Sequence, residues 1–121
     1  MNYKYEKLGK EQTKQVLRNL NICNLRIECD GKQYTSPMNY TFKQDGCDFV
    51  FTLKGSLNSV NIGLLETNPN VALEFIEREG NVVRTAVVLG KVQTDYPLTQ
   101  QYKKASIKIK LIQISGRGYR C

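Results

Sequence analysis

Two Asp-Gly pairs divide the first part of the chain into segments of alternating polarity. Apolar and polar side chains alternate from Ile22 to Cys29, and Asp30-Gly31 follows directly. Such a pair is a preferred centre for a tight turn between antiparallel strands. A second alternating segment, 33–43, ends near Asp45-Gly46, and a third begins at Phe49. The sequence therefore predicts a three-stranded meander, which must bury one of its faces.

Segments with helical spacing flank this meander. Residues 10–21 carry apolar side chains on one side, which predicts a short amphipathic helix before the first strand. Residues 57–66 predict a second helix, and it must end before Pro69 because proline disfavours helical geometry at the residue preceding it. Residues 97–104 predict a third short helix.

The second half of the chain predicts further strands at 71–76, 82–93 and 107–111, with a turn at 79–81. The run 86–89 is apolar on both faces, so both sides of this strand need cover, from a closed barrel or from a partner subunit. The alternation slips at Ile112 and Ile114, which predicts a bulge. Gly116 and Gly118 predict a loosened tail. Six strands with a few short helices predict a small barrel, because closure removes exposed sheet edges.

The chain is basic, with 18 Lys and Arg against 11 Asp and Glu and a net charge of +7 over its 121 residues. Residues 96–121 hold no acidic side chain but carry six Lys and Arg. This excess favours an anionic partner, either nucleic acid or a phosphorylated small molecule, although a solubilising surface is the alternative. The length is that of a single domain.

Histidine is absent, which excludes His-based triads, His proton shuttles and most metal sites. The four cysteines, Cys23, Cys29, Cys47 and Cys121, lack the CxxC spacing of zinc sites. Without a histidine to activate a thiol, we expect small buried thiols and, at Cys121, an exposed terminal one. The sequence thus predicts no metal site and identifies no catalytic residue.

No segment approaches the roughly 20 apolar residues needed to span a bilayer. The N-terminal segment is polar, and no apolar stretch follows it. We therefore expect a cytoplasmic protein that makes no contact with a membrane.

Five short segments match a known pattern in both order and spacing. They are Pro37-Met38-Asn39-Tyr40, Phe49-Val50-Phe51-Thr52, Leu65-Glu66-Thr67-Asn68-Pro69-Asn70-Val71, Ala86-Val87-Val88-Leu89-Gly90-Lys91-Val92, and Ile107-Lys108-Ile109-Lys110 followed by Ser115-Gly116-Arg117. Together they resemble the FMN-binding split barrel of the pyridoxamine 5′-phosphate oxidase-like superfamily, in its short, nitroimidazole-resistance-type branch. The resemblance implies a mainly β fold with α+β elements, a six-stranded antiparallel split β-barrel with a few short peripheral helices. Residues 1–121 would then form a single FMN-binding domain.

The resemblance also implies a homodimer with one FMN in each of two grooves between the protomers. Three groups of residues would lie along the flavin. The isoalloxazine edge takes Met38, Asn39 and Tyr40, the ribityl chain takes Thr52, Leu53 and Lys54, and the phosphate end takes Ser59 and Asn61.

The chain departs from the family pattern at the phosphate end. Relatives commonly carry a basic pair there, whereas this chain has Ser59-Val60-Asn61. A phosphate monoester carries about −1.5 to −2 charges at neutral pH, so a cation is expected beside it. Lys54 is the nearest in sequence, and Arg84, or Arg117 of the partner subunit, are the other candidates.

The implied activity is that of an FMN-dependent oxidoreductase, which reduces a small oxidised substrate with electrons from a nicotinamide donor. The flavin carries the electrons, so a chain without histidine can still function. The alternative is a flavin-free split-barrel binding module that uses its basic surface for nucleic acid or another anionic ligand. Nucleic acid is the less favoured partner because the sequence contains no RNA-binding signature. A deazaflavin or haem in the same groove is a third alternative.

Overall fold

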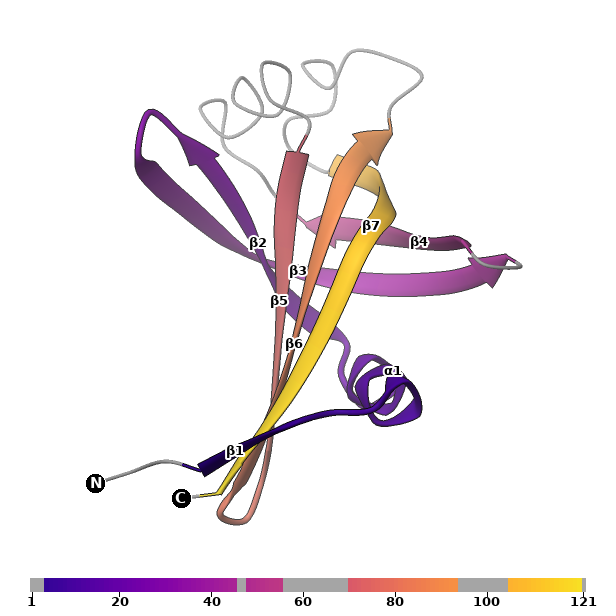
Figure 1. Cartoon of the computed structure of the whole chain (residues 1–121). Coiled ribbons are helices and arrows are strands. Elements are labelled where there is room, and N and C mark those ends of the chain that lie inside the picture. The colour runs from indigo at the N-terminus through magenta and orange to yellow at the C-terminus, as the bar shows by residue number, and fades with distance from the viewer. Residues whose placement is uncertain (1–3, 46–47, 56–69, 94–104, 121) are drawn as a thin grey trace.

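The structure of the chain is a computed structural model that describes residues 4–45, 48–55, 70–93 and 105–120. These residues form seven strands and one helix (Figure 1). In chain order they are β1 (Lys4–Lys7), α1 (Lys10–Asn19), β2 (Ile22–Cys29), β3 (Lys32–Asp45), β4 (Asp48–Gly55), β5 (Asn70–Glu79), β6 (Val82–Gln93) and β7 (Ala105–Arg120).

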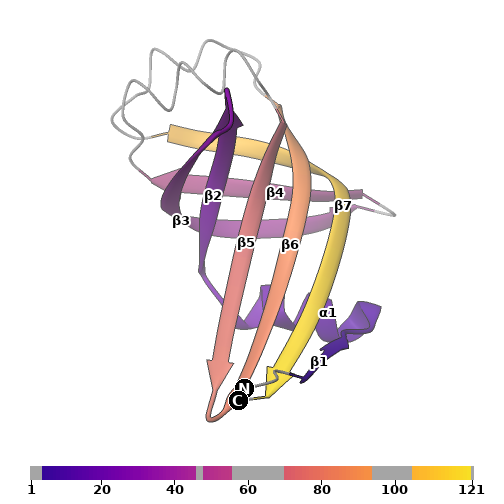
Figure 2. The same cartoon turned by 60° about the vertical axis from the view of Figure 1, so that its left-hand side comes forward.

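Six of the strands close into a ring. Every pairing is antiparallel, and the order β7-β4-β3-β2-β5-β6 returns to β7. The beginning of β7 pairs with β4, and the remainder pairs with β6, so this long strand joins two groups of strands. Figure 2 shows the result: β5, β6 and the end of β7 run side by side and cross in front of β3 and β4. This ring confirms the predicted six-stranded, mainly β barrel.

The barrel interior is filled by the inward-facing side chains of the alternating strands. Tyr40 packs edge-on against Phe75 with 4.9 Å between ring centroids, and Phe51 lies 5.9 Å from Phe75. Phe51, Phe75 and their aliphatic neighbours Leu25, Leu53 and others are fully buried. Because each strand contributes every second residue to this core, strand register fixes which side chains remain outside.

Helix α1 covers one end of the barrel. Its buried side chains are Thr13, Val16 and Leu17, which share one face of the helix. The Tyr40 hydroxyl donates a 2.6 Å hydrogen bond to the backbone carbonyl of Leu17. A buried side chain of β3 is thereby tied to the helix.

Several predictions can be compared with these elements. The helix at the start of the chain, the Asp30-Gly31 hairpin, the antiparallel pairing of β3 with β4 and the strand 82–93 are confirmed, whereas Gly46 of the second predicted turn lies outside the described residues. The predicted bulge is also confirmed, because Leu111 pairs with Gly90 and Gln113 with Leu89, which leaves Ile112 without a partner in this ladder. The helices expected at 57–66 and 97–104 lie outside the described residues.

Two features differ from expectation at the ends of the chain. Strand β1, which pairs with Arg117–Arg120 of β7, was not expected because its sequence, KYEK, is short and polar. The prediction of a loosened tail at Gly116 and Gly118 is wrong, since both glycines belong to β7 and pair with β6. The small size of Gly116 allows close packing, because a Cβ at this position would collide with Thr13 of α1.

Candidate functional site

The outer face of β3 and β4 carries polar side chains in register. Asn39 pairs with Lys54, and Thr41 pairs with Thr52. Asn39, Thr41 and Lys54 are exposed, and Thr52 is partly buried. This platform therefore combines an amide, two hydroxyls and one ammonium group, supported from inside by the aromatic core.

Three predicted site residues face the opposite way. The side chains of Met38, Tyr40 and Leu53 are buried in the barrel, because they occupy the strand positions between the outward-facing ones. Burial, together with the neighbouring Cys23 thiol, raises the pKa of the Tyr40 hydroxyl well above its ordinary value. That hydroxyl is also committed to the Leu17 carbonyl. On the outer face, a ligand would meet the backbone of these three residues.

The structure thus brings together Asn39, Thr52 and Lys54 on one surface. Ser59 and Asn61, predicted for the phosphate end, lie outside the described residues. Sequence analysis did not identify Thr41, although the alternation that places Asn39 outward also places Thr41 outward.

The three candidate cations for a phosphate differ in their surroundings. Lys54 is exposed and takes part in none of the ion pairs found among the described residues. Arg84 contacts Glu79 at 3.1 Å and Glu77 at 3.2 Å, and these hydrogen bonds raise its pKa. Arg117 lies on β7 and also has an interaction partner. Lys54 is therefore the cation of the three that lies on the polar platform.

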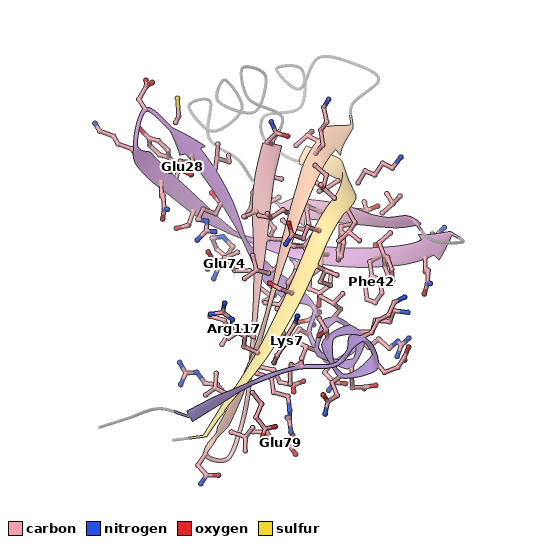
Figure 3. The ribbon with its side chains drawn as sticks, viewed as in Figure 1. Lys7, Glu28, Phe42, Glu74, Glu79 and Arg117 are labelled. Atoms are coloured by element: carbon pink, nitrogen blue, oxygen red, sulfur yellow. The ribbon has the colours of Figure 1, made fainter. Side chains whose placement is uncertain are left out.

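A second feature of the outer surface is a cavity of about 350 Å³ beside the β-bulge. Its lining residues come from β2, β5, β6 and β7: Arg26, Glu28, Asn70, Val71, Ala72, Leu89, Gly90 and Ile112. The Arg26 guanidinium contacts Glu74 at 2.5 Å. Figure 3 shows Glu74 on the side of the barrel where β2 and β5 lie, with Glu28 farther along toward the β2–β3 hairpin. Sequence analysis missed this cavity because its residues meet only through strand pairing.

A polar cavity of about 290 Å³ lies between α1 and the ends of β5 and β6. Its charged groups are Glu77, Glu79 and Arg84. The Arg84 guanidinium contacts both carboxylates, and Asn19 donates a 2.7 Å hydrogen bond to Glu77. Figure 3 shows Glu79 at this end of the barrel, near the β5–β6 hairpin. Because Asn19 belongs to α1 and its partner Glu77 belongs to β5, this network attaches the helix to the barrel.

The two cysteines in the described part of the chain are free thiols. Burial raises the pKa of Cys23 to about 12, so this thiol stays protonated and unreactive at neutral pH. Cys29 is partly buried. Among the described residues, no group of three or more Cys, Asp or Glu side chains is arranged to hold a metal ion. Nor does the described helix have the length and apolar character needed to cross a membrane.

Comparison with known proteins identifies the architecture. No family model matches the chain, and no curated protein sequence matches it. Solved structures do match. A FAD-binding protein from Mesorhizobium loti is 19% identical, with a TM-score of 0.76 over 99% of this chain and 100% of that one. A candidate 5-nitroimidazole antibiotic resistance protein from Bacteroides thetaiotaomicron is 16% identical, with a TM-score of 0.75 over 98% and 90%.

A third matching structure is described with a family name. It is a protein from Clostridium acetobutylicum related to general stress protein 26, of the pyridoxinephosphate oxidase family, with 17% identity and a TM-score of 0.66 over 91% of this chain and 87% of that one. The chain has the same split-barrel fold as these solved structures. At these identities the similarity shows the fold alone, and function depends on the surfaces described above.

Proposed function

We propose that this split-barrel protein is a flavin-dependent oxidoreductase that binds FMN on the outer face of β3 and β4 and acts as a homodimer. The observation that carries the proposal is the placement of Lys54 beside Asn39 and Thr52 on a surface supported by the aromatic core. The similarity in fold to a protein named for FAD binding supports a flavin as the ligand.

In this arrangement, each group has a distinct task. The Asn39 amide and the Thr52 hydroxyl offer hydrogen bonds to the polar edge and the ribityl chain of the flavin. The Lys54 ammonium neutralises the phosphate, with Ser59 and Asn61 as further proposed contacts at that end. Met38, Tyr40 and Leu53 contribute backbone groups and a rigid floor. When bound, the flavin supplies the electron transfer itself.

The second protomer would cover the outer face of β5 and β6. Ile76 is 45% exposed and Leu89 is 42% exposed on this face, with the partly buried Val87 between them in the outward-facing series. Glu74, which pairs with Arg26, lies on the same face directly opposite Val87, so the face combines exposed apolar side chains with an ion pair, as protein interfaces do. The electrons would come from a nicotinamide donor and pass to a small oxidised acceptor. The free thiols Cys23 and Cys29 suit the reducing cytoplasm, where we place the protein.

An absorbance spectrum of the purified protein tests the proposal. We expect a flavin spectrum, either as isolated or after addition of FMN, and mass spectrometry of the ligand released on denaturation distinguishes FMN from FAD. Lys54→Gln should weaken FMN binding by about tenfold or more, because charge-assisted hydrogen bonds contribute about 1.5–3 kcal/mol.

Lys32→Gln is the matched control for this experiment. Lys32 is also exposed, but it lies at the β2–β3 turn, and its replacement removes the same charge away from the platform. Protein that stays colourless in excess FMN and FAD would overturn the proposal. Equal losses in the two variants would remove Lys54 from the site.

A further inference from the structure

An exposed isoleucine lies beside the polar platform. Ile22, the first residue of β2, pairs directly with Asn39 of β3, which in turn pairs with Lys54 of β4. Directly paired residues on neighbouring strands point to the same side of a sheet, so these three side chains form one row across the outer face. Ile22 is 55% exposed, whereas the next residue, Cys23, is buried. The row therefore runs from an ammonium group through an amide to an apolar side chain.

Pro37 enlarges the apolar end of this row. It precedes Asn39 by two residues, so it lies on the same face of β3, and it is exposed. Its register partner is Asn24, two residues after Ile22 on β2, which makes Ile22 and Pro37 diagonal neighbours. Two exposed apolar side chains thus adjoin Asn39.

The backbone at Ile22 is fixed by hydrogen bonds to β3. The Tyr40 amide donates a 3.1 Å hydrogen bond to the carbonyl of Asn21, directly before Ile22, and the β2–β3 ladder begins at the Ile22–Asn39 pair. A ligand that contacts Ile22 would therefore meet a preformed surface and would not have to order a loop, which favours binding.

The barrel core does not account for this exposed side chain, and neither does the proposed contact between protomers. In the described part of the chain, the other strongly exposed large apolar side chains are Ile76 and Leu89, on the outer face of β5 and β6, and Ile112, at the bulge of β7. Ile22 differs from them because it is in direct register with the polar platform.

The groups of FMN follow one another in the same order as this row. The phosphate is at one end, the polar ribityl chain comes next, and the apolar edge of the ring is at the other end. Because neighbouring strands lie about 4.8 Å apart, the backbone at Ile22 is about 10 Å from that at Lys54. A flavin whose phosphate meets Lys54 would extend its ring across Asn39 toward Ile22.

We propose that Ile22, with Pro37 beside it, contacts the isoalloxazine ring and selects the ligand by this ring, independently of its phosphate. The contact would remove apolar surface of both the ring and Ile22 from water, which favours binding. This inference rests on the proposed flavin site. It adds to that site a residue of β2 and the direction of the flavin across the strands, from β4 to β2.

Riboflavin and FMN are the probes, because riboflavin has the same ring and ribityl chain as FMN but lacks the phosphate. In equilibrium titrations followed by flavin absorbance, Ile22→Thr should weaken the binding of both flavins by the same factor, about tenfold, since it removes apolar contact and places a hydroxyl against the ring. Lys54→Gln should weaken FMN binding and leave riboflavin binding unchanged. The two variants would thus act on opposite ends of one ligand.

Ile22→Val is the matched control. Valine and threonine are both β-branched and have nearly the same shape, so both suit a strand, and they differ in one methyl group against one hydroxyl. Ile22→Val should weaken the binding of either flavin by about fourfold or less, because it removes a single methylene group. Since Ile22 is exposed, the ligand-free variants should unfold in urea at the same midpoint as the parent protein.

Three results would overturn this inference and leave the flavin proposal in place. They are equal losses in Ile22→Thr and Ile22→Val, a loss of FMN binding without a loss of riboflavin binding in Ile22→Thr, and a change in the native mass of Ile22→Thr, which would assign Ile22 to the contact between protomers. A parent protein that binds neither flavin would instead overturn the proposed function, and this inference with it. The parent protein therefore tests the flavin site, and the Ile22 variants test the ring contact.

Discussion

Gly116 is where β7 and α1 make their closest approach. A Cβ built on this residue would overlap Thr13 Oγ1 and lie 3.0 Å from Thr13 Cγ2. Thr13 cannot easily move, because its hydroxyl donates a 2.9 Å hydrogen bond to the Gly9 carbonyl and its side chain is buried. Gly116→Ala should therefore lower the free energy of unfolding by about 1–3 kcal/mol, measured by urea denaturation.

Gly118→Ala is the control for this prediction. The added methyl group there would meet Leu8 Cδ2 at 3.3 Å, the far end of a flexible side chain, so a smaller loss is expected. The double variant Gly116→Ala with Thr13→Ala should recover part of the stability lost in Gly116→Ala. If Gly118→Ala is as damaging as Gly116→Ala, the explanation by helix contact is wrong.

The sequence predicts which strands form the candidate site better than it predicts which of their side chains face a ligand. The alternation of residues 33–43 puts Met38 and Tyr40 on one strand face with Phe42, and in the structure this face is the inner one. Met38 and Tyr40 were nevertheless predicted at the flavin, because the family resemblance assigns positions without distinguishing side chain from backbone. Periodicity correctly predicts which residues of the strand share a face. Which of the two faces is buried depends on packing against the other strands of the core.

At the scale of elements, a polar network attaches α1 to the sheet. The Glu77 side chain is 11% exposed and accepts hydrogen bonds from Asn19 of α1 and from Arg84 of β6. Glu79 also binds Arg84, but its side chain is 77% exposed. Glu77→Gln should cost about 1–3 kcal/mol of stability because a buried charge-assisted pairing is lost, and Glu79→Gln less than about 1 kcal/mol. Urea denaturation of the two variants measures the difference, and equal losses would contradict it.

The sequence alone predicts neither this polar network nor the outer surface proposed for the flavin, because both depend on how the strands pair. Strand existence follows from alternation and from Asp-Gly turns, which are local signals. Glu77 and Asn19 are 58 residues apart, and the Ile22–Asn39 and Asn39–Lys54 pairs depend on register between strands. Register is set by core packing around the whole ring, so contacts between distant residues emerge only when the barrel is assembled.

The outer face of β5 and β6 exposes two large apolar side chains, Ile76 and Leu89, that the core of the barrel does not use. If a second copy covers it, the native protein has twice the 13.8 kDa mass of the chain in sedimentation velocity. Ile76→Lys should shift the protein toward the monomer, since a buried ammonium without a partner would oppose association. Because the proposed flavin groove lies between protomers, the same variant should lose bound FMN in parallel.

Thr35→Lys adds the same charge at an exposed position of the β2–β3 hairpin and should leave both mass and flavin content unchanged. A monomeric parent protein would remove the dimer from the proposal. A dimeric Ile76→Lys variant would instead move the interface away from β5, to another face of the barrel. Loss of flavin from a variant that stays dimeric would show that Ile76 acts on the ligand independently of assembly. Measuring the native mass and the flavin content of the same variants therefore tests whether the flavin binds in the groove between two protomers or to a single barrel.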